Sequence, residues 1–92
     1  MPTIEIPTPL RPYANHQSII LIAGDTVKAV LDNLLTQYPD LEKHLKDSKG
    51  KLRSFVNIYV GDQDIRSLDG VDTELEEGDQ LTIIPSIAGG GQ

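Results

Sequence analysis

The 92-residue chain contains no cysteine and no tryptophan, and aromatic residues make up only 4% of it. Without cysteine it can form no disulfide and no thiolate metal site, and it has no cysteine nucleophile. A cysteine-free chain fits the cytoplasm, and we expect the protein there. Because aromatic side chains are so few, the hydrophobic core must be aliphatic.

Long apolar runs and an excess of positive charge are also lacking. No segment reaches the roughly 18 apolar residues of a membrane span, and residues 1–5 lack the basic start of a signal peptide. The formal net charge is −6, whereas a nucleic-acid binder needs a basic face. We therefore expect neither a membrane nor a nucleic acid as a partner.

The charges are unevenly spread along the chain. Residues 62–79 hold eight acidic residues and one base, whereas residues 43–53 hold five bases and one acid. Such a distribution is typical of a solvated surface, and it also suits a surface that steers a partner of complementary charge.

Hydrophobic patterning indicates an α+β chain. Five segments have the composition of strands: residues 3–6, 18–23, 55–60, 63–66 and 80–85. The fourth is expected to be a short edge strand, and three prolines between the first two predict an extended connection over residues 7–17. Residues 68–78 are rich in turn signals.

One amphipathic helix is expected after Gly24. Its apolar positions share one face: Val27, Val30, Leu31, Leu34 and Leu35. Asp25 or Thr26 can cap it, Pro39 ends it, and a short helical stretch follows from Asp40. The order of elements predicts a ubiquitin-like β-grasp roll, in which the first and last strands lie parallel at the sheet centre and the helix covers one face. Residues 1–85 form this domain, and residues 86–92 a flexible tail.

The tail has no charged side chain, and Gly89, Gly90 and Gly91 have no side chain at all. Three consecutive glycines cannot help to build a core, because glycine loses the most backbone entropy on ordering. The tail is either a disordered end or a tether that passes through a narrow channel and presents a terminal carboxylate to another protein.

A catalytic or metal centre is not expected. His16 and His44 have no neighbouring ligand in the sequence, so a metal site is not predicted. No serine lies in a nucleophile elbow, and the glycine run opens no helix, so it is no phosphate-binding loop. The chain is not expected to be an enzyme on its own.

The C-terminal third resembles the signature of the ubiquitin-like sulfur carrier proteins, the MoaD/ThiS group. The residues of this signature are Leu75, Gly78, Asp79, Leu81, Ile83, Pro85, Gly89 and Gly90. Residues 6–12, 24–26, 55–60 and 64–66 are similar to the members that carry sulfur for cysteine synthesis. The resemblance extends over nearly the whole chain.

This resemblance implies a mechanism. An E1-like activating enzyme of the MoeB/ThiF type adenylates the terminal glycine carboxylate with MgATP, and a sulfur donor converts it to a thiocarboxylate. A cysteine synthase-type or other sulfur-accepting enzyme then takes the sulfide. The reactive residue is expected to be Gly90, so Gly91 and Gln92 must be removed, for example by a JAMM-type metalloprotease; cleavage after Gly91 stays open.

Partner docking is expected on the sheet face that the helix leaves uncovered. The candidates are Ile58 or Tyr59, between which the strand register does not decide, and Ile87 at the root of the tail. Other functions share the tail and the fold. They are the small subunit of molybdopterin synthase, the thiamine-thiazole carrier, a carrier for tRNA thiolation, a protein modifier, and an interaction module that is never activated.

Overall fold

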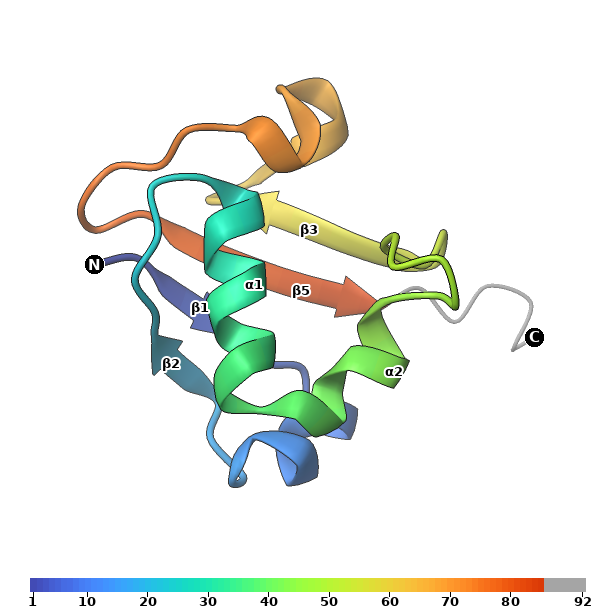
Figure 1. Cartoon of the computed structure of the whole chain (residues 1–92). Coiled ribbons are helices and arrows are strands. Elements are labelled where there is room, and N and C mark those ends of the chain that lie inside the picture. The colour runs from blue at the N-terminus through green and yellow to red at the C-terminus, as the bar shows by residue number, and fades with distance from the viewer. Residues whose placement is uncertain (86–92) are drawn as a thin grey trace.

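The last strand is the centre of the sheet. The structure is a computed structural model that describes residues 1–85, and its five strands have the order β2-β1-β5-β3-β4 (Figure 1). The strands are β1 (Thr3–Glu5), β2 (Ile19–Leu21), β3 (Val56–Val60), β4 (Gln63–Asp64) and β5 (Gln80–Pro85). β5 pairs in parallel with β1 and antiparallel with β3. The predicted β-grasp topology is confirmed.

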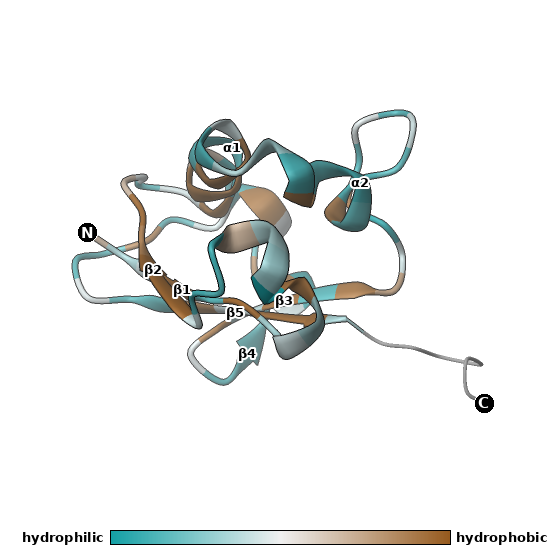
Figure 2. Ribbon diagram, turned by 90° about the horizontal axis from the view of Figure 1, so that it is seen from below, coloured by the Kyte–Doolittle hydropathy of each residue, from teal (hydrophilic) through white to brown (hydrophobic). Residues whose placement is uncertain are grey.

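Helix α1 (Val27–Gln37) crosses one face of this sheet (Figure 1). It begins at Thr26, whose side-chain oxygen accepts a hydrogen bond of 3.1 Å from the Ala29 backbone N–H, so the N-cap is the second of the two predicted residues. The chain continues through a 3₁₀ turn, η2 (Pro39–Leu41), into the short helix α2 (Glu42–Leu45). Both α helices lie on the same side of the sheet (Figure 2).

Strand alternation separates the core from the opposite face of the sheet. Ile4, Ile58 and Ile83 are at most 2% exposed and point toward the helix side. Their chain neighbours point the other way, since successive side chains of a strand alternate between faces. All apolar residues of the buried cluster are aliphatic, as the lack of aromatic residues predicted.

Two local predictions are wrong. Residues 7–17 are not extended, because Thr8–Ala14 form a 3₁₀ helix, η1, that buries Leu10 and Ala14. Proline fixes φ near −65°, a value that a 3₁₀ helix accepts as readily as an extended chain does. The edge strand stops at Asp64, and Ile65–Ser67 turn into another 3₁₀ helix, η3, because the Asp64 carboxylate accepts a hydrogen bond from the Arg66 backbone N–H.

Gly24 sits against the first turn of α1. Its φ is +152°, and a Cβ at this position would lie 2.7 Å from both the Cγ2 and the backbone nitrogen of Val30. Gly61 has a φ of +61° and no atom within 4 Å of such a Cβ. Gly61→Ala should therefore cost about 1–2 kcal/mol for its backbone conformation alone, whereas Gly24→Ala should cost a further 1–3 kcal/mol, about the penalty of overpacking. Urea unfolding of the two variants measures the difference, and equal losses would contradict the close packing of Gly24 on α1.

Candidate functional site

The carboxyl end of β5 carries the chain away from the centre of the sheet. Pro85 is paired with Val56, the first residue of β3, so the chain leaves at the edge where β3 begins. The predicted tail residues Ile87, Gly89, Gly90 and Gly91 lie outside the described residues.

One face of the sheet is covered by helices, and the opposite face, which we call the outer face, presents exposed apolar side chains. Ile19 and Leu21 of β2 are 54% and 58% exposed, and Ile84 of β5 is 43% exposed. Tyr59 of β3 is half-buried and lies on the same face, opposite Thr82 of β5. Thr3 and Glu5 of β1 and Thr82 of β5 lie between them. The face thus mixes apolar and polar side chains, as the contact surfaces of non-obligate complexes do.

The structure decides between Ile58 and Tyr59. Ile58 is 1% exposed, so the prediction that it docks a partner is wrong. The register of β3 places Ile58 and Val56 on the face that the helices cover. Tyr59, like Asn57, reaches the outer face, and of the two candidates it is the one that can dock a partner.

The sequence reasoning missed Ile19, Leu21 and Ile84. A signal for them was present, because residues 19–22 and 81–84 contain apolar residues at consecutive positions. A strand with one buried face needs apolar side chains only at alternate positions, so the additional ones must lie on the other face.

Beside Tyr59, the outer face ends at an ion pair. Asp64 of β4 is opposite Tyr59, and the Nη2 of Arg66 donates a hydrogen bond of 2.7 Å to an Asp64 carboxylate oxygen and another to the Asn57 side-chain oxygen. The hydrogen bond from the Arg66 side chain lowers the pKa of the Asp64 carboxyl group and raises the pKa of the guanidinium. Arg66 is thereby held beside the apolar surface.

The two histidines stand in different surroundings. His16 is exposed, and the ring of His44 packs on Tyr13 with 4.3 Å between the ring centroids. Among residues 1–85, no three histidine, aspartate or glutamate side chains are placed to hold a metal ion together. No helix in this part of the chain is long and apolar enough to cross a membrane.

Known proteins share both this sequence and this fold. The family model described as the ThiS family matches residues 4–90. The sulfur carrier protein CysO of Mycobacterium tuberculosis is 44% identical over 90 residues, which cover 96% of this chain and 97% of that protein. Its crystal structure superposes with a TM-score of 0.85, at 42% identity, over 94% of this chain and 99% of that one.

Two further proteins extend the comparison. The crystal structure of the Amycolatopsis orientalis BexX/CysO complex contains a chain with a TM-score of 0.86 and 32% identity, over 94% of this chain and 96% of that one. The small archaeal modifier protein 3 of Haloferax volcanii is 34% identical over 65 residues, which cover 71% of this chain and 70% of that protein.

These matches bear on the predictions from the sequence. The mycobacterial relative is named as a carrier, which confirms the expectation of a carrier protein in place of an enzyme. The match to the family model covers nearly the whole chain, and the resemblance of the C-terminal signature is confirmed. The chain belongs to the ThiS family.

Proposed function

We propose that the protein is a sulfur carrier whose C-terminal glycine becomes a thiocarboxylate and donates sulfide for cysteine synthesis. The observation that carries the proposal is that the family match runs to residue 90, which is the second glycine of the tail. The mycobacterial relative that matches nearly the whole chain is named as a sulfur carrier. The end of β5 at Pro85, at the margin of the sheet, suits a domain that presents the following residues to other proteins.

The chemistry takes place on the Gly90 carboxylate once it is the chain terminus. A carboxylate oxygen attacks the α-phosphate of MgATP in an E1-like activating enzyme, which forms the acyl-adenylate and releases pyrophosphate. Hydrosulfide then attacks the glycine carbonyl, AMP leaves, and a proton is lost, so the product is the thiocarboxylate. Since a free carboxylate is a poor electrophile, the adenylate supplies the leaving group. Glycine adds no Cβ to obstruct a narrow channel.

The proposed acceptor is an enzyme that adds the sulfide to an activated serine. A relative of the carrier has been crystallised in the BexX/CysO complex, which supports the proposal that such carriers form complexes with a second protein. Gly91 and Gln92 are removed before activation, in our proposal by a JAMM-type metalloprotease.

A mass measurement tests the function. The chain ending at Gly90 is incubated with the matching activating enzyme, MgATP and sulfide, and its intact mass should increase by the exchange of one oxygen for one sulfur. The mass should stay unchanged without ATP. If the complete mixture also leaves the mass unchanged, the carrier function is contradicted.

The outer face is the surface that the activating enzyme contacts in this proposal. Ile84→Asp puts a charge on the outer face, opposite Asn57 and on the strand next to Tyr59, and it should weaken binding at least about tenfold, the effect of 1.4 kcal/mol. Ile87→Asp should have the same effect. Isothermal titration calorimetry measures the affinity, and circular dichroism checks that the fold survives.

Leu68→Asp is the matched control for this docking surface. Leu68 is 37% exposed, close to the 43% of Ile84, but it follows η3 and is not part of a strand. The substitution removes a comparable apolar side chain and adds the same charge, and the affinity should remain within about twofold, since surface substitutions elsewhere usually change little. Equal weakening by Leu68→Asp and Ile84→Asp would overturn the docking surface.

A second candidate function is that of a protein modifier. The Haloferax volcanii relative is named as a modifier protein, and the activated terminal glycine of a modifier would react with a lysine amine in place of hydrosulfide. Incubation of the Gly90-ended chain with the activating enzyme and a cell extract distinguishes the two functions. Covalent adducts of higher mass that resist reducing agents would favour the modifier, and their absence together with thiocarboxylate formation would favour the carrier.

A further inference from the structure

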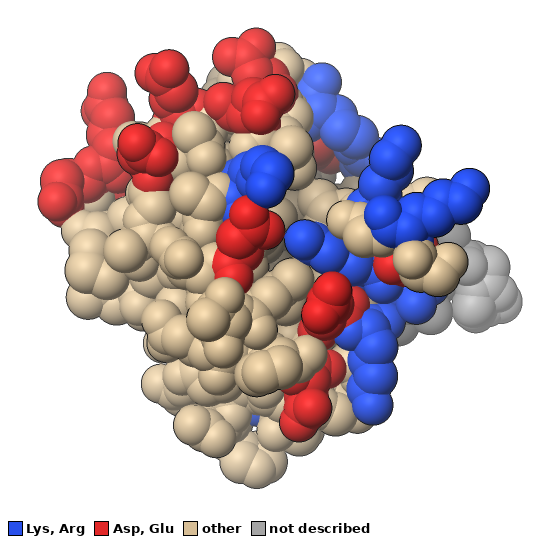
Figure 3. Space-filling view, in the orientation of Figure 1, with Lys and Arg blue, Asp and Glu red and all other residues tan. Residues whose placement is uncertain are grey.

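The charged side chains of the molecule are separated in space as well as in sequence. Blue side chains gather on the side where β5 ends, and red ones gather at the opposite end (Figure 3). We call the basic set the cationic surface; its members are Lys28, Lys43, Lys46, Lys49, Lys51 and Arg53. The acidic end includes Asp69, Asp72, Glu74, Glu76 and Glu77. Four acidic residues lie among these six bases, Asp32, Asp40, Glu42 and Asp47, so this side of a protein of net charge −6 keeps a small positive excess.

The cationic surface borders the place where the chain leaves the sheet. The Arg53 backbone N–H donates to the Leu45 carbonyl at 2.9 Å, and its side-chain Nε donates to the Lys43 carbonyl at 3.1 Å. These bonds fix the segment that leads into Val56, the residue paired with Pro85. The cationic surface therefore lies beside the end of β5.

Asp47 is the one acidic residue in the basic segment 43–53, and it leaves the ammonium groups of Lys49 and Lys51 available to a partner. The Asp47 carboxylate accepts hydrogen bonds from the backbone N–H groups of Lys49 and Lys51, at 2.8 and 3.1 Å. These two bonds lower the pKa of the Asp47 carboxyl group. Within residues 1–85, neither the Lys49 nor the Lys51 ammonium lies within 4 Å of a carboxylate.

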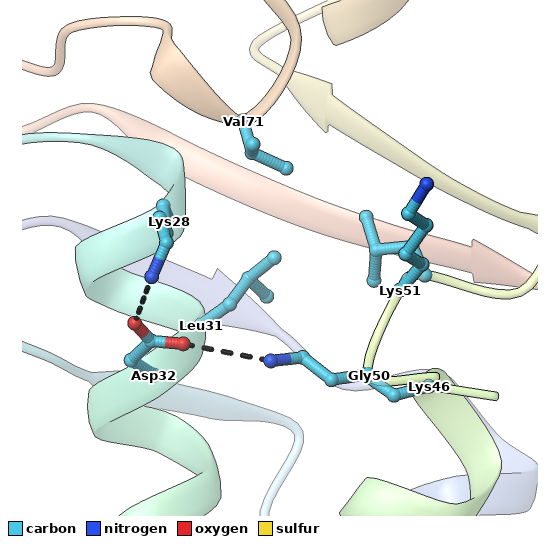
Figure 4. A pocket seen from close by; sticks show the side chains of 8 residues that line it. Lys28, Leu31, Asp32, Lys46, Gly50, Lys51 and Val71 are labelled. Carbon is cyan, nitrogen blue, oxygen red and sulfur yellow. Dashed lines mark hydrogen bonds and ion pairs between the residues drawn. The ribbon is translucent and has the colours of Figure 1, made fainter. Parts of the chain in front are cut away.

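A hollow with an apolar floor opens in the same surface. It has a volume of about 390 Å³ and lies between α1 and residues 46–52 (Figure 4). Leu31, Leu52 and Val71 line it, and three lysines and one aspartate surround it. Helix α1 supplies Lys28, Leu31 and Asp32, and a β-bridge joins Lys46 and Leu52 at the two ends of the loop.

The single carboxylate at the rim is shared between two lysines. Asp32 lies 2.8 Å from the Lys28 Nζ and 3.5 Å from the Lys46 Nζ, through different carboxylate oxygens. The Lys28 hydrogen bond lowers the pKa of the Asp32 carboxyl group. With Lys51 as the third cation, the rim keeps an excess of two positive charges above an apolar floor, which suits an acidic partner that also presents an apolar side chain.

We propose that the cationic surface is a second docking surface, distinct from the outer face, and that it receives an acidic segment of the activating enzyme beside that enzyme's channel for the tail. One apolar side chain of the segment occupies the hollow. This inference rests on the proposed function. An acidic enzyme surface repels a carrier of net charge −6 unless the cationic side faces it, and that orientation brings the tail to the channel. The contribution is to the rate of productive encounter, because charges at the rim of an interface act mainly on association.

Two double variants with the same change of net charge test the proposal in a chain that ends at Gly90. Lys49→Gln with Lys51→Gln removes two positive charges from the cationic surface. Gln63→Glu with Ser67→Glu adds two negative charges at exposed positions of β4 and η3, outside both docking surfaces. The first should lower kcat/KM for ATP–pyrophosphate exchange about tenfold, within the range of electrostatic steering, with kcat unchanged. The second should change it less than about twofold, as surface substitutions outside an interface usually do.

Salt dependence and two single variants complete the experiment. Raising the ionic strength from about 0.01 to about 0.15 M shortens the Debye length from about 30 to about 8 Å and should remove most of the difference between the lysine variant and the unsubstituted chain. Asp32→Asn should raise kcat/KM, because it adds net positive charge at the hollow. Val71→Thr keeps the side-chain shape but puts a hydroxyl group into the apolar floor of the hollow. It should raise koff of the complex with the activating enzyme several-fold at either ionic strength.

The outcomes separate this inference from the proposed function. If no chain, including the unsubstituted one, supports exchange, the proposed function fails. If the unsubstituted chain is active but the two double variants lose equal activity, the effect is one of net charge and the docking surface is overturned. It is also overturned if the lysine variant is as active as the unsubstituted chain at low ionic strength.

Discussion

A chain ending at Gly90 should support ATP–pyrophosphate exchange at least about 10²-fold faster than the chain ending at Gln92, since a misplacement of about 1 Å at a reacting atom already costs about that much. The two additional residues move the terminal carboxylate by up to about 7 Å. They also make glutamine, in place of glycine, the terminal residue that must enter the proposed narrow channel of the activating enzyme. The exchange assay with the matching activating enzyme measures the ratio.

The chain ending at Gly91 is the internal comparison for this experiment. It keeps a glycine end but lies one residue out of register, so we expect an exchange rate between those of the other two chains. A faster rate for the Gly91 end than for the Gly90 end would move the reactive residue to Gly91. Equal rates for all three chains would contradict the need for processing.

Replacing Ile83 by alanine should lower the free energy of unfolding by about 2–5 kcal/mol, the usual loss for a buried aliphatic side chain. Ile83 is 2% exposed and lies in the central strand between β1 and β3. Domains of this kind have a total stability of about 5–15 kcal/mol, so the loss is a large part of the whole. Urea unfolding monitored by circular dichroism gives the value.

The adjacent residue Ile84 is a control of the same type on the same strand. It is 43% exposed on the outer face, and Ile84→Ala should cost no more than about 1 kcal/mol, because less apolar area leaves water when it folds. In binding to the activating enzyme the order should be reversed, with Ile84 the sensitive position. Similar stability losses in both variants would contradict the assignment of the two faces.

The parts of the fold that were predictable depend on local patterns. Apolar residues at helical spacing and a capping threonine specify α1, and an apolar run ended by Pro85 specifies β5. Residues 8–14 were not predictable as a 3₁₀ helix, because the φ of proline suits both conformations, and the burial of Leu10 and Ala14 decides between them. That burial is a property of the assembled core.

The candidate site was predictable only in part, for the same reason. The resemblance to the sulfur carriers identified the tail, but the choice between Ile58 and Tyr59 depended on which face of β3 meets α1, and strand patterns fix this only when the register is known. The hollow between Leu31, Leu52 and Val71 joins three segments far apart in the sequence. No local pattern indicates it.

The central place of β5 also determines how the domain responds to mechanical load. A protein that grips the residues after Pro85 and pulls applies force along the axis of β5, which is bonded to β1 on one side and to β3 on the other. The hydrogen bonds of both ladders run across the strands, so they are loaded in shear and resist together, whereas an edge strand peeled from its end would lose them one at a time. The domain can therefore be pulled by its C-terminal end without unravelling from that side.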